Sequence, residues 1–214
     1  VEGDPRTGLS RRTAGVLQFS GLMRVLGVPE GQAWRIAEAA ADWADSDSRA
    51  GPGGAEDAAY ASGPEPYRTG NTLFADVGEL SRLSGMTPEV MARLRPWLCA
   101  LPATDLSPIN INTLAPEQAP LLAMMAPGQL AVERARRILA ARPASGWGSQ
   151  VEFWRIEALR DLDVPLDMQL QLQLRTRWFA LESRVALMDA ELTQTALVDA
   201  RLQPSRLVAR SWAE

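Results

Sequence analysis

The chain has 214 residues, of which 46% are hydrophobic, enough for one large domain or two small ones with a real core. Its formal net charge is −4, so bulk electrostatics give no support to a nucleic-acid partner. It has no histidine, no lysine and one cysteine, which excludes Ser-His-Asp and Cys-His catalysis, lysine nucleophiles, Walker-type phosphate loops and thiolate metal clusters. No run of about 18 apolar residues is present, so no membrane-spanning segment is predicted.

The N-terminal part is predicted to be helical. Apolar residues recur at helical spacing from Val16 to Leu26, and Gly27 ends the run. Pro29 opens a second helix, which continues to Ala44. The following segment is rich in acidic residues, glycine and proline up to about Gly70, and this composition predicts a loop.

Short helices are predicted in the middle third. Thr87-Pro88-Glu89 places a cap residue, a first-turn proline and an acid at the start of one helix. Thr113 to Glu117 repeats this arrangement before a second helix, and a third helix is predicted over Leu130 to Ala141. Cys99 lies between Leu98 and Ala100 and is predicted to be a small buried hydrophobe.

After Pro165 the hydrophobic period changes. Polar and apolar residues alternate from Gln169 to Leu174, which predicts a strand. Three further runs, separated by turns at 189–191 and 203–205, predict an antiparallel meander with one buried face: Trp178 to Met188, Leu192 to Arg201 and Arg206 to Trp212. Helices first and a small sheet last predict the α+β class.

The most distinctive segment is the acidic loop that follows the second helix. Five carboxylates surround a stretch of glycine and proline: Asp42, Asp45, Asp47, Glu56 and Asp57. Calcium suits such a site because it takes about 6–8 oxygen ligands in adaptable geometry. Counted from Asp45, the spacing resembles an EF-hand, but Arg49 and Ala50 stand at the fifth and sixth positions, so an EF-hand is excluded. The alternative is a solvated acidic loop.

Six motifs also occur in a characteristic order. They are Asp42-Trp43-Ala44-Asp45-Ser46-Asp47, Gly54-Ala55-Glu56-Asp57-Ala58-Ala59-Tyr60, Pro66-Tyr67-Arg68, Asp76-Val77-Gly78-Glu79-Leu80, Gly85-Met86-Thr87 and Ile109-Asn110-Ile111-Asn112-Thr113. Together, from about Phe19 to Trp212, they resemble the minor pseudopilin K of bacterial type II secretion systems, the general secretion pathway protein K family.

The resemblance implies an α+β fold in which a pilin-like antiparallel sheet carries a large, mostly helical inserted domain with helix-hairpin-helix-like units. It places a truncated N-terminal segment or linker at residues 1–18 and the helical domain with the acidic loop at 19–165. The C-terminal strands of the pseudopilin sheet then fill 166–214. The chain would be the periplasmic part of a protein anchored in the inner membrane by an N-terminal helix that this sequence lacks.

The resemblance also implies a structural calcium ion, Ca2+, in the helical domain. By the family pattern, its ligands would be Asp45, Asp47, Glu56 and Asp57, with Asn71 as a further carbonyl donor. Asp42 is expected on the last helical turn, either behind the ligands or in solvent. The ion would lock a loop that buries too little apolar surface to order itself.

The implied function is non-enzymatic. Such proteins sit at the tip of the type II secretion pseudopilus in a heterotrimer with the minor pseudopilins I and J, where they initiate the pseudopilus and support protein export across the outer membrane. The secretin and secreted cargo are further expected partners, and nucleic acid is not.

Two other functions compete with this reading. Ile109 to Thr113, the helices after it and Trp147-Gly148-Ser149 resemble helix-hairpin-helix modules, in which Pro127-Gly128, Arg134, Arg136 and Arg137 would meet a DNA backbone. The hairpin lacks the glycine-hydrophobic-glycine turn, and the negative net charge opposes phosphate binding. An enzyme with Glu56 and Asp57 as paired acid and base is disfavoured, because adjacent carboxylates do not readily flank one bond from opposite sides.

Overall fold

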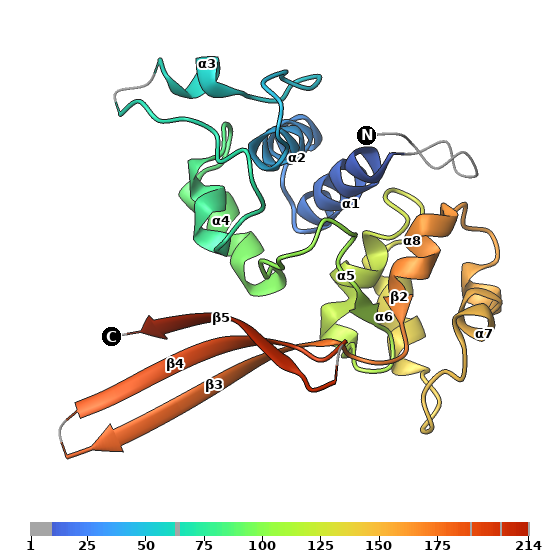
Figure 1. Cartoon of the computed structure of the whole chain (residues 1–214). Coiled ribbons are helices and arrows are strands. Elements are labelled where there is room, and N and C mark those ends of the chain that lie inside the picture. Colours follow the sequence, from blue (N-terminus) through green and yellow to red (C-terminus); the bar gives the residue numbers. More distant parts are fainter. Residues whose placement is uncertain (1–9, 63–64, 189, 202, 214) are drawn as a thin grey trace.

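A computed structural model describes residues 10–62, 65–188, 190–201 and 203–213. The chain forms a helical part up to residue 174, from which a three-stranded antiparallel sheet projects (Figure 1). This arrangement confirms the predicted α+β class. No helix within the described ranges has the length and apolarity needed to cross a bilayer.

Two antiparallel helices open the helical part. Helix α1 (Arg11–Val25) starts at Ser10, whose hydroxyl accepts a hydrogen bond from the Thr13 N–H, and ends before Gly27, which has φ of 84°. Helix α2 (Glu30–Ala44) forms where a second helix was predicted, and it packs against α1. Helix α1 begins five residues before the first apolar residue of the predicted run. The predicted domain boundary after residue 18 therefore falls inside a helix, and residues 11–18 belong to the helical part; residues 1–9 lie outside the described residues.

Four short elements complete the first half of the helical part: α3 (Asp57–Tyr60), η1 (Val77–Arg82), α4 (Pro88–Leu94) and η2 (Arg95–Trp97). Thr87 caps α4, as predicted, by accepting a hydrogen bond from the Val90 N–H at 3.3 Å. The prediction that Cys99 is buried is wrong. The backbone becomes extended at Leu98, after η2, and Cys99 is exposed. We call the apolar cluster of this half the first core; it includes Val16, Leu22, Met23, Ile36, Trp43, Tyr60, Leu80, Val90 and Leu94.

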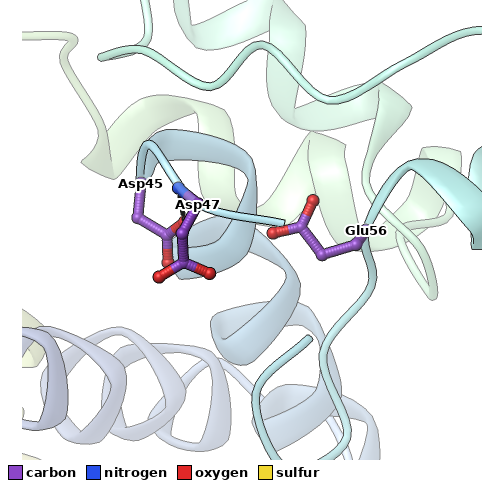
Figure 2. A group of neighbouring side chains, drawn as sticks. All are labelled: Asp45, Asp47 and Glu56. Carbon is purple, nitrogen blue, oxygen red and sulfur yellow. Dashed lines mark hydrogen bonds between the residues drawn. The ribbon is translucent and has the colours of Figure 1, made fainter. Parts of the chain in front are cut away.

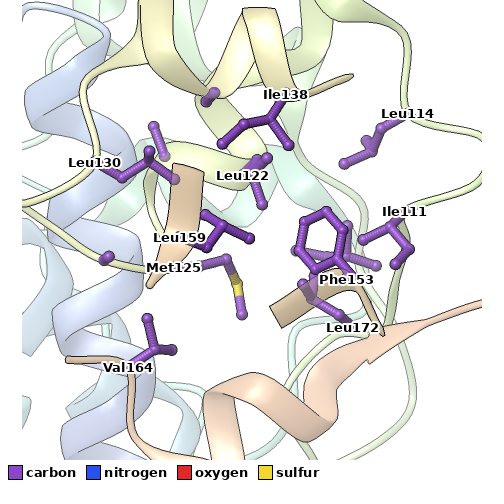
Figure 3. Close-up of a cluster of buried hydrophobic side chains, with 14 of the residues drawn as sticks. Ile111, Leu114, Leu122, Met125, Leu130, Ile138, Phe153, Leu159, Val164 and Leu172 are labelled. Carbon is purple, nitrogen blue, oxygen red and sulfur yellow. The ribbon is translucent and has the colours of Figure 1, made fainter. Parts of the chain in front are cut away.

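A second apolar cluster, the second core, fills the other half of the helical part (Figure 3). It is surrounded by β1 (Ile109–Asn110), η3 (Pro116–Gln118), α5 (Ala119–Ala123), α6 (Val132–Ala140), α7 (Gln150–Trp154), η4 (Glu157–Leu159), α8 (Leu166–Gln171) and β2 (Leu172–Gln173). Phe153, Leu122 and Leu172 are among its fully buried side chains. Strands β1 and β2 pair in parallel, which joins the start of this half of the helical part to its end.

The predicted strand over Gln169 to Leu174 is wrong for most of its length. Residues up to Gln171 continue α8, and only Leu172 and Gln173 form a strand. Met168 and Gln171, three residues apart on α8, are buried, and so is Leu172 directly after the helix, whereas Leu170 is exposed. Burial here therefore follows the period of a helix and not that of a strand. Gln171 also donates a hydrogen bond to the Ser107 carbonyl at 2.6 Å. Residues 166–174 therefore belong to the helical part rather than to the C-terminal sheet.

The C-terminal meander is confirmed as strands β3 (Trp178–Leu187), β4 (Ala190–Asp199) and β5 (Arg206–Ala213), paired in that order. Strand β4 already begins at Ala190, inside the predicted turn, and Asp189 lies outside the described residues. The register places Trp178 and Leu197 on one face and most of the large apolar side chains on the other: Phe179, Leu181, Val185, Leu187, Leu192, Val198, Leu207 and Trp212. We call this the apolar sheet face.

The prediction that one face of the meander is buried is wrong for the described residues. The side chains of Leu181, Leu187 and Trp212 are 54%, 71% and 59% exposed. The alternation of residues identified which face of the sheet is apolar. The sheet projects away from the helical part, which therefore does not cover this face (Figure 1).

Candidate metal centre

The acidic loop folds back over the C-terminal end of α2 and brings three of the predicted ligands together. Asp45 is the C-cap residue of α2, and its Oδ1 accepts a hydrogen bond from the Asp47 N–H at 3.3 Å. Glu56 stands at the other end of the loop, immediately before α3, and its carboxylate points toward the aspartate pair (Figure 2). One carboxylate oxygen from each of Asp45, Asp47 and Glu56 lies within 4.8 Å of the others.

Glu56 is the residue that distinguishes this group from a solvated acidic loop. Glu56 is only 7% exposed, and its Oε1 atom is buried without a hydrogen-bond partner. A buried carboxylate oxygen without a donor is costly unless a cation pairs with it. Burial raises the pKa of Glu56, and loss of solvent likewise raises the pKa of Asp45. These residues therefore fit a bound cation with oxygen ligands.

The other two predicted ligands meet Glu56 through a threonine. The Thr69 Oγ1 atom lies 2.8 Å from Asp57 Oδ1, 3.0 Å from Asn71 Oδ1 and 3.3 Å from Glu56 Oε2. Hydrogen bonds from the Thr69 hydroxyl and N–H lower the pKa of Asp57. Asp57 and Asn71 are thus placed beside Glu56, outside the group formed with Asp45 and Asp47. Thr69 belongs to none of the six motifs, so no sequence pattern pointed to it.

Asp42 lies on the last turn of α2, as expected, and it is fully buried behind the loop. Its carboxylate forms an ion pair with Arg12 of α1 and accepts hydrogen bonds from the Gly51 N–H at 3.0 and 3.1 Å. Arg12 also contacts Glu38 Oε2 through Nη1 at 2.8 Å. Sequence reasoning missed Arg12, because it lies 30 residues before Asp42 and carries no local pattern.

Two glycines allow the loop to close over this ion pair. A Cβ atom at Gly54 would lie 2.8 Å from Asp42 Cγ and still closer to Oδ2. A Cβ at Gly51 would lie 2.7 Å from Glu38 Oε2 and would also overlap the Arg12 guanidinium. Contacts below 3.0 Å are essentially never made by real Cβ atoms, so a Cβ at Gly54 would displace the fully buried Asp42 carboxylate, and one at Gly51 would displace the ends of the Arg12 and Glu38 side chains.

An aromatic cluster fixes the segment that carries Thr69 against α2. The Trp43 ring lies 5.7 Å from Tyr60, 6.2 Å from Tyr67 and 6.4 Å from Phe74, measured between ring centroids. The Tyr67 hydroxyl donates to the Arg82 carbonyl at 2.6 Å. Aromatic packing of this kind stabilises both ends of the acidic segment, and the buried Ala55 and a hydrogen bond from the Gly54 N–H to the Gly51 carbonyl order part of the loop between them.

The residues proposed for DNA binding are largely used within the protein. Arg134 donates to the Ala158 carbonyl at 2.8 Å and pairs with Asp161, whose Oδ2 is 3.1 Å from Nη1. Arg136 pairs with Glu133 on the same helix. Two of the three arginines are therefore neutralised by acidic neighbours, and nothing in this geometry favours a phosphate-binding surface.

Comparison with known proteins identifies the family. Two family models, both described as "Type II secretion system (T2SS), protein K", match residues 4–103 and 109–174. Curated relatives named "Type II secretion system protein K" include one from Dickeya chrysanthemi, 36% identical over 90% of this chain and 53% of its own. Another from Pectobacterium carotovorum subsp. carotovorum is 32% identical over 91% of this chain and 58% of its own.

A solved structure agrees with the sequence matches. The fold is similar to a chain in the crystal structure of the GspK-GspI-GspJ complex from the enterotoxigenic Escherichia coli type 2 secretion system. The TM-score is 0.82 at 30% identity, over 96% of this chain and 72% of that chain. The chain belongs to the type II secretion system protein K family. It spans 53% and 58% of the length of the two curated relatives named above.

Proposed function

We propose that this chain is the periplasmic part of a minor pseudopilin that sits at the tip of the type II secretion pseudopilus with the minor pseudopilins I and J. The observation that carries the proposal is the likeness to a chain of the GspK-GspI-GspJ complex over 96% of this chain. The role is structural: the tip complex initiates the pseudopilus and supports export, with the secretin and cargo as further contacts, and no catalysis is involved.

The apolar sheet face supports this proposal. Its leucines, valines and aromatic residues, most of them exposed, share one face of a sheet that projects from the helical part. Large exposed apolar surfaces mark places where another segment or protein packs. In the pilin-like scaffold that the family resemblance implies, an N-terminal helix anchored in the inner membrane would cover this face and continue into the pseudopilus.

A substitution on the apolar sheet face tests the proposal. In the full-length protein, Leu181→Asp would place a charge on this face and is expected to lower recovery of a complex with co-expressed pseudopilins I and J. The measurement is co-purification from membranes. The matched control is Arg184→Asp on the same strand, which points to the opposite, polar face and is expected to leave the complex intact.

Failure of the wild-type protein to co-purify with either partner would contradict the tip proposal as a whole. If the Leu181→Asp variant yields as much complex as the wild-type protein, only the role given to the apolar sheet face is contradicted.

For the acidic loop we propose a structural calcium ion held by Asp45, Asp47 and Glu56, with Asp57 and Asn71 close by. The support is the group of three carboxylates together with the unpartnered, buried Oε1 of Glu56. Calcium takes more oxygen ligands than three carboxylates supply, so backbone carbonyls, the residues around Thr69 or water would complete the set. When bound, the ion supplies the positive charge that lets these carboxylates lie together.

Removing single ligands is expected to weaken calcium binding. Asp47→Asn and Glu56→Gln each keep the side-chain shape and remove one charge, and each should raise the calcium Kd at least about tenfold. A charged contact contributes about 1.5–3 kcal/mol, and about 1.4 kcal/mol corresponds to a factor of ten. Isothermal titration calorimetry measures the effect, with the exposed Glu117→Gln as the control. Wild-type affinity in both Asp47→Asn and Glu56→Gln would contradict the ligand assignment.

A further inference from the structure

Arg12 places a permanent positive charge inside the acidic loop. Its guanidinium reaches three carboxylates from α2 and its C-cap: Nη1 contacts Glu38, Nη2 contacts Asp42, and Nε lies 3.8 Å from Asp45 Oδ2. The Arg12 side chain is 27% exposed, whereas the Glu38 and Asp42 side chains are 6% and 0% exposed. This is a largely buried ion network, where charges interact more strongly than at the surface.

Asp45 belongs to two groups at once. On one side it faces Arg12, and on the other it contributes an oxygen to the group with Asp47 and Glu56. The buried Glu56 Oε1 atom has no hydrogen-bond partner, so no hydrogen bond connects it to the guanidinium. The loop therefore has two places for positive charge, one filled by Arg12 and the other facing Glu56.

The Arg12 charge also changes what a bound ion experiences. The guanidinium contacts Glu38, Asp42 and Asp45, and Asp45 is also part of the group with Asp47 and Glu56. The Coulomb energy between a fixed charge and an ion is proportional to the charge of the ion. A neighbouring cation therefore disfavours a trivalent ion more than a divalent one, whereas removing it would favour the trivalent ion.

We propose that Arg12 is a positioning and charge-setting residue of the calcium centre: it holds Asp45 for the ion and tunes the site for a divalent cation. The inference rests on the calcium site proposed above. It makes α1 part of the centre, although no predicted ligand lies on that helix.

The test compares the affinities of two ions of different charge, Ca2+ and Tb3+, by isothermal titration calorimetry. In Arg12→Met the ratio of Tb3+ affinity to Ca2+ affinity should rise on the order of tenfold over wild type. Arg12→Lys, which keeps the charge, should restore the wild-type ratio. Arg49→Met removes a charge from the same loop at an exposed position and should change the ratio little.

The ratio separates this role from a purely structural one. If Arg12 only kept the loop closed, its loss would weaken both ions by the same factor, and the ratio would stay constant. An unchanged ratio in Arg12→Met thus overturns the inference while leaving the calcium site intact. Wild-type protein that binds neither ion would overturn the calcium site and the inference together.

A reciprocal variant keeps the inference testable if Arg12→Met does not fold. Glu38→Gln removes a negative charge on the far side of Arg12 and leaves the Arg12–Asp42 pair in place. The ratio should then move in the opposite direction, below the wild-type value. A rise or no change in Glu38→Gln contradicts the charge-setting role.

Discussion

Gly54→Ala is expected to lower the free energy of unfolding by about 1–3 kcal/mol, the usual range for forcing an extra methyl group into a packed site. For a chain of this size the melting temperature should fall by roughly 2–12 °C. The new Cβ would collide with the fully buried carboxylate of Asp42, which Arg12 and Gly51 hold in place, so the backbone of the loop must move. Because Glu56 follows two residues later, calcium affinity should fall as well.

Thermal unfolding with and without calcium measures both effects, and Gly15→Ala is the matched control. Gly15 lies within α1, and a Cβ there meets nothing within 4 Å. Alanine is a better helix former than glycine by about 0.5–1 kcal/mol, so this variant should unfold at a slightly higher temperature. Equal melting temperatures for Gly54→Ala and wild type would show that the loop does not close over Asp42.

Removing calcium is expected to destabilise the wild-type protein by a comparable amount. At a calcium concentration 100 times the Kd, a single site contributes about 2.7 kcal/mol, so excess chelator should lower the melting temperature by roughly 5–11 °C. The physical reason is the close approach of Asp45, Asp47 and Glu56, which repel one another without an ion. Differential scanning calorimetry with calcium, with magnesium and with chelator gives the comparison.

Magnesium should restore little of the loss, because it demands a tighter octahedral shell and gives up its water reluctantly. Identical melting temperatures in calcium and in chelator would return the segment to the alternative considered from the sequence, a solvated acidic loop. The family assignment would be untouched, since it depends on the sequence and structural matches.

Much of the fold could be predicted because its signals are local. Thr and Pro at helix starts and Gly27 at a helix end marked helices, and β-compatible runs separated by turns marked β3 to β5. The strand predicted from Gln169 to Leu174 was wrong because a six-residue alternation also fits the end of a short helix, here one with Met168 and Gln171 inward. Pro165, directly before α8, was the available signal for a helix start.

The candidate site divides in the same way. Asp45, Asp47 and Glu56 could be selected from the acidic composition of one loop together with the family resemblance, and they lie close together because that loop closes on itself. Arg12 and Thr69 could not, since each reaches the loop from a distant segment through tertiary packing. The exposure of the apolar sheet face was equally hidden, because alternation shows which side of a strand is apolar but not whether another segment covers it.

Helix α1 joins the two apolar cores of the helical part. Ala14 lies in the second core, while Val16, Leu22 and Met23 of the same helix lie in the first. Gln18 of α1 donates a hydrogen bond to Gln171 at 2.6 Å, near the end of α8, from which the chain runs through β2 into the sheet. One helix thus contributes side chains to both cores. Unfolding of α1 would therefore expose apolar side chains of both cores at once.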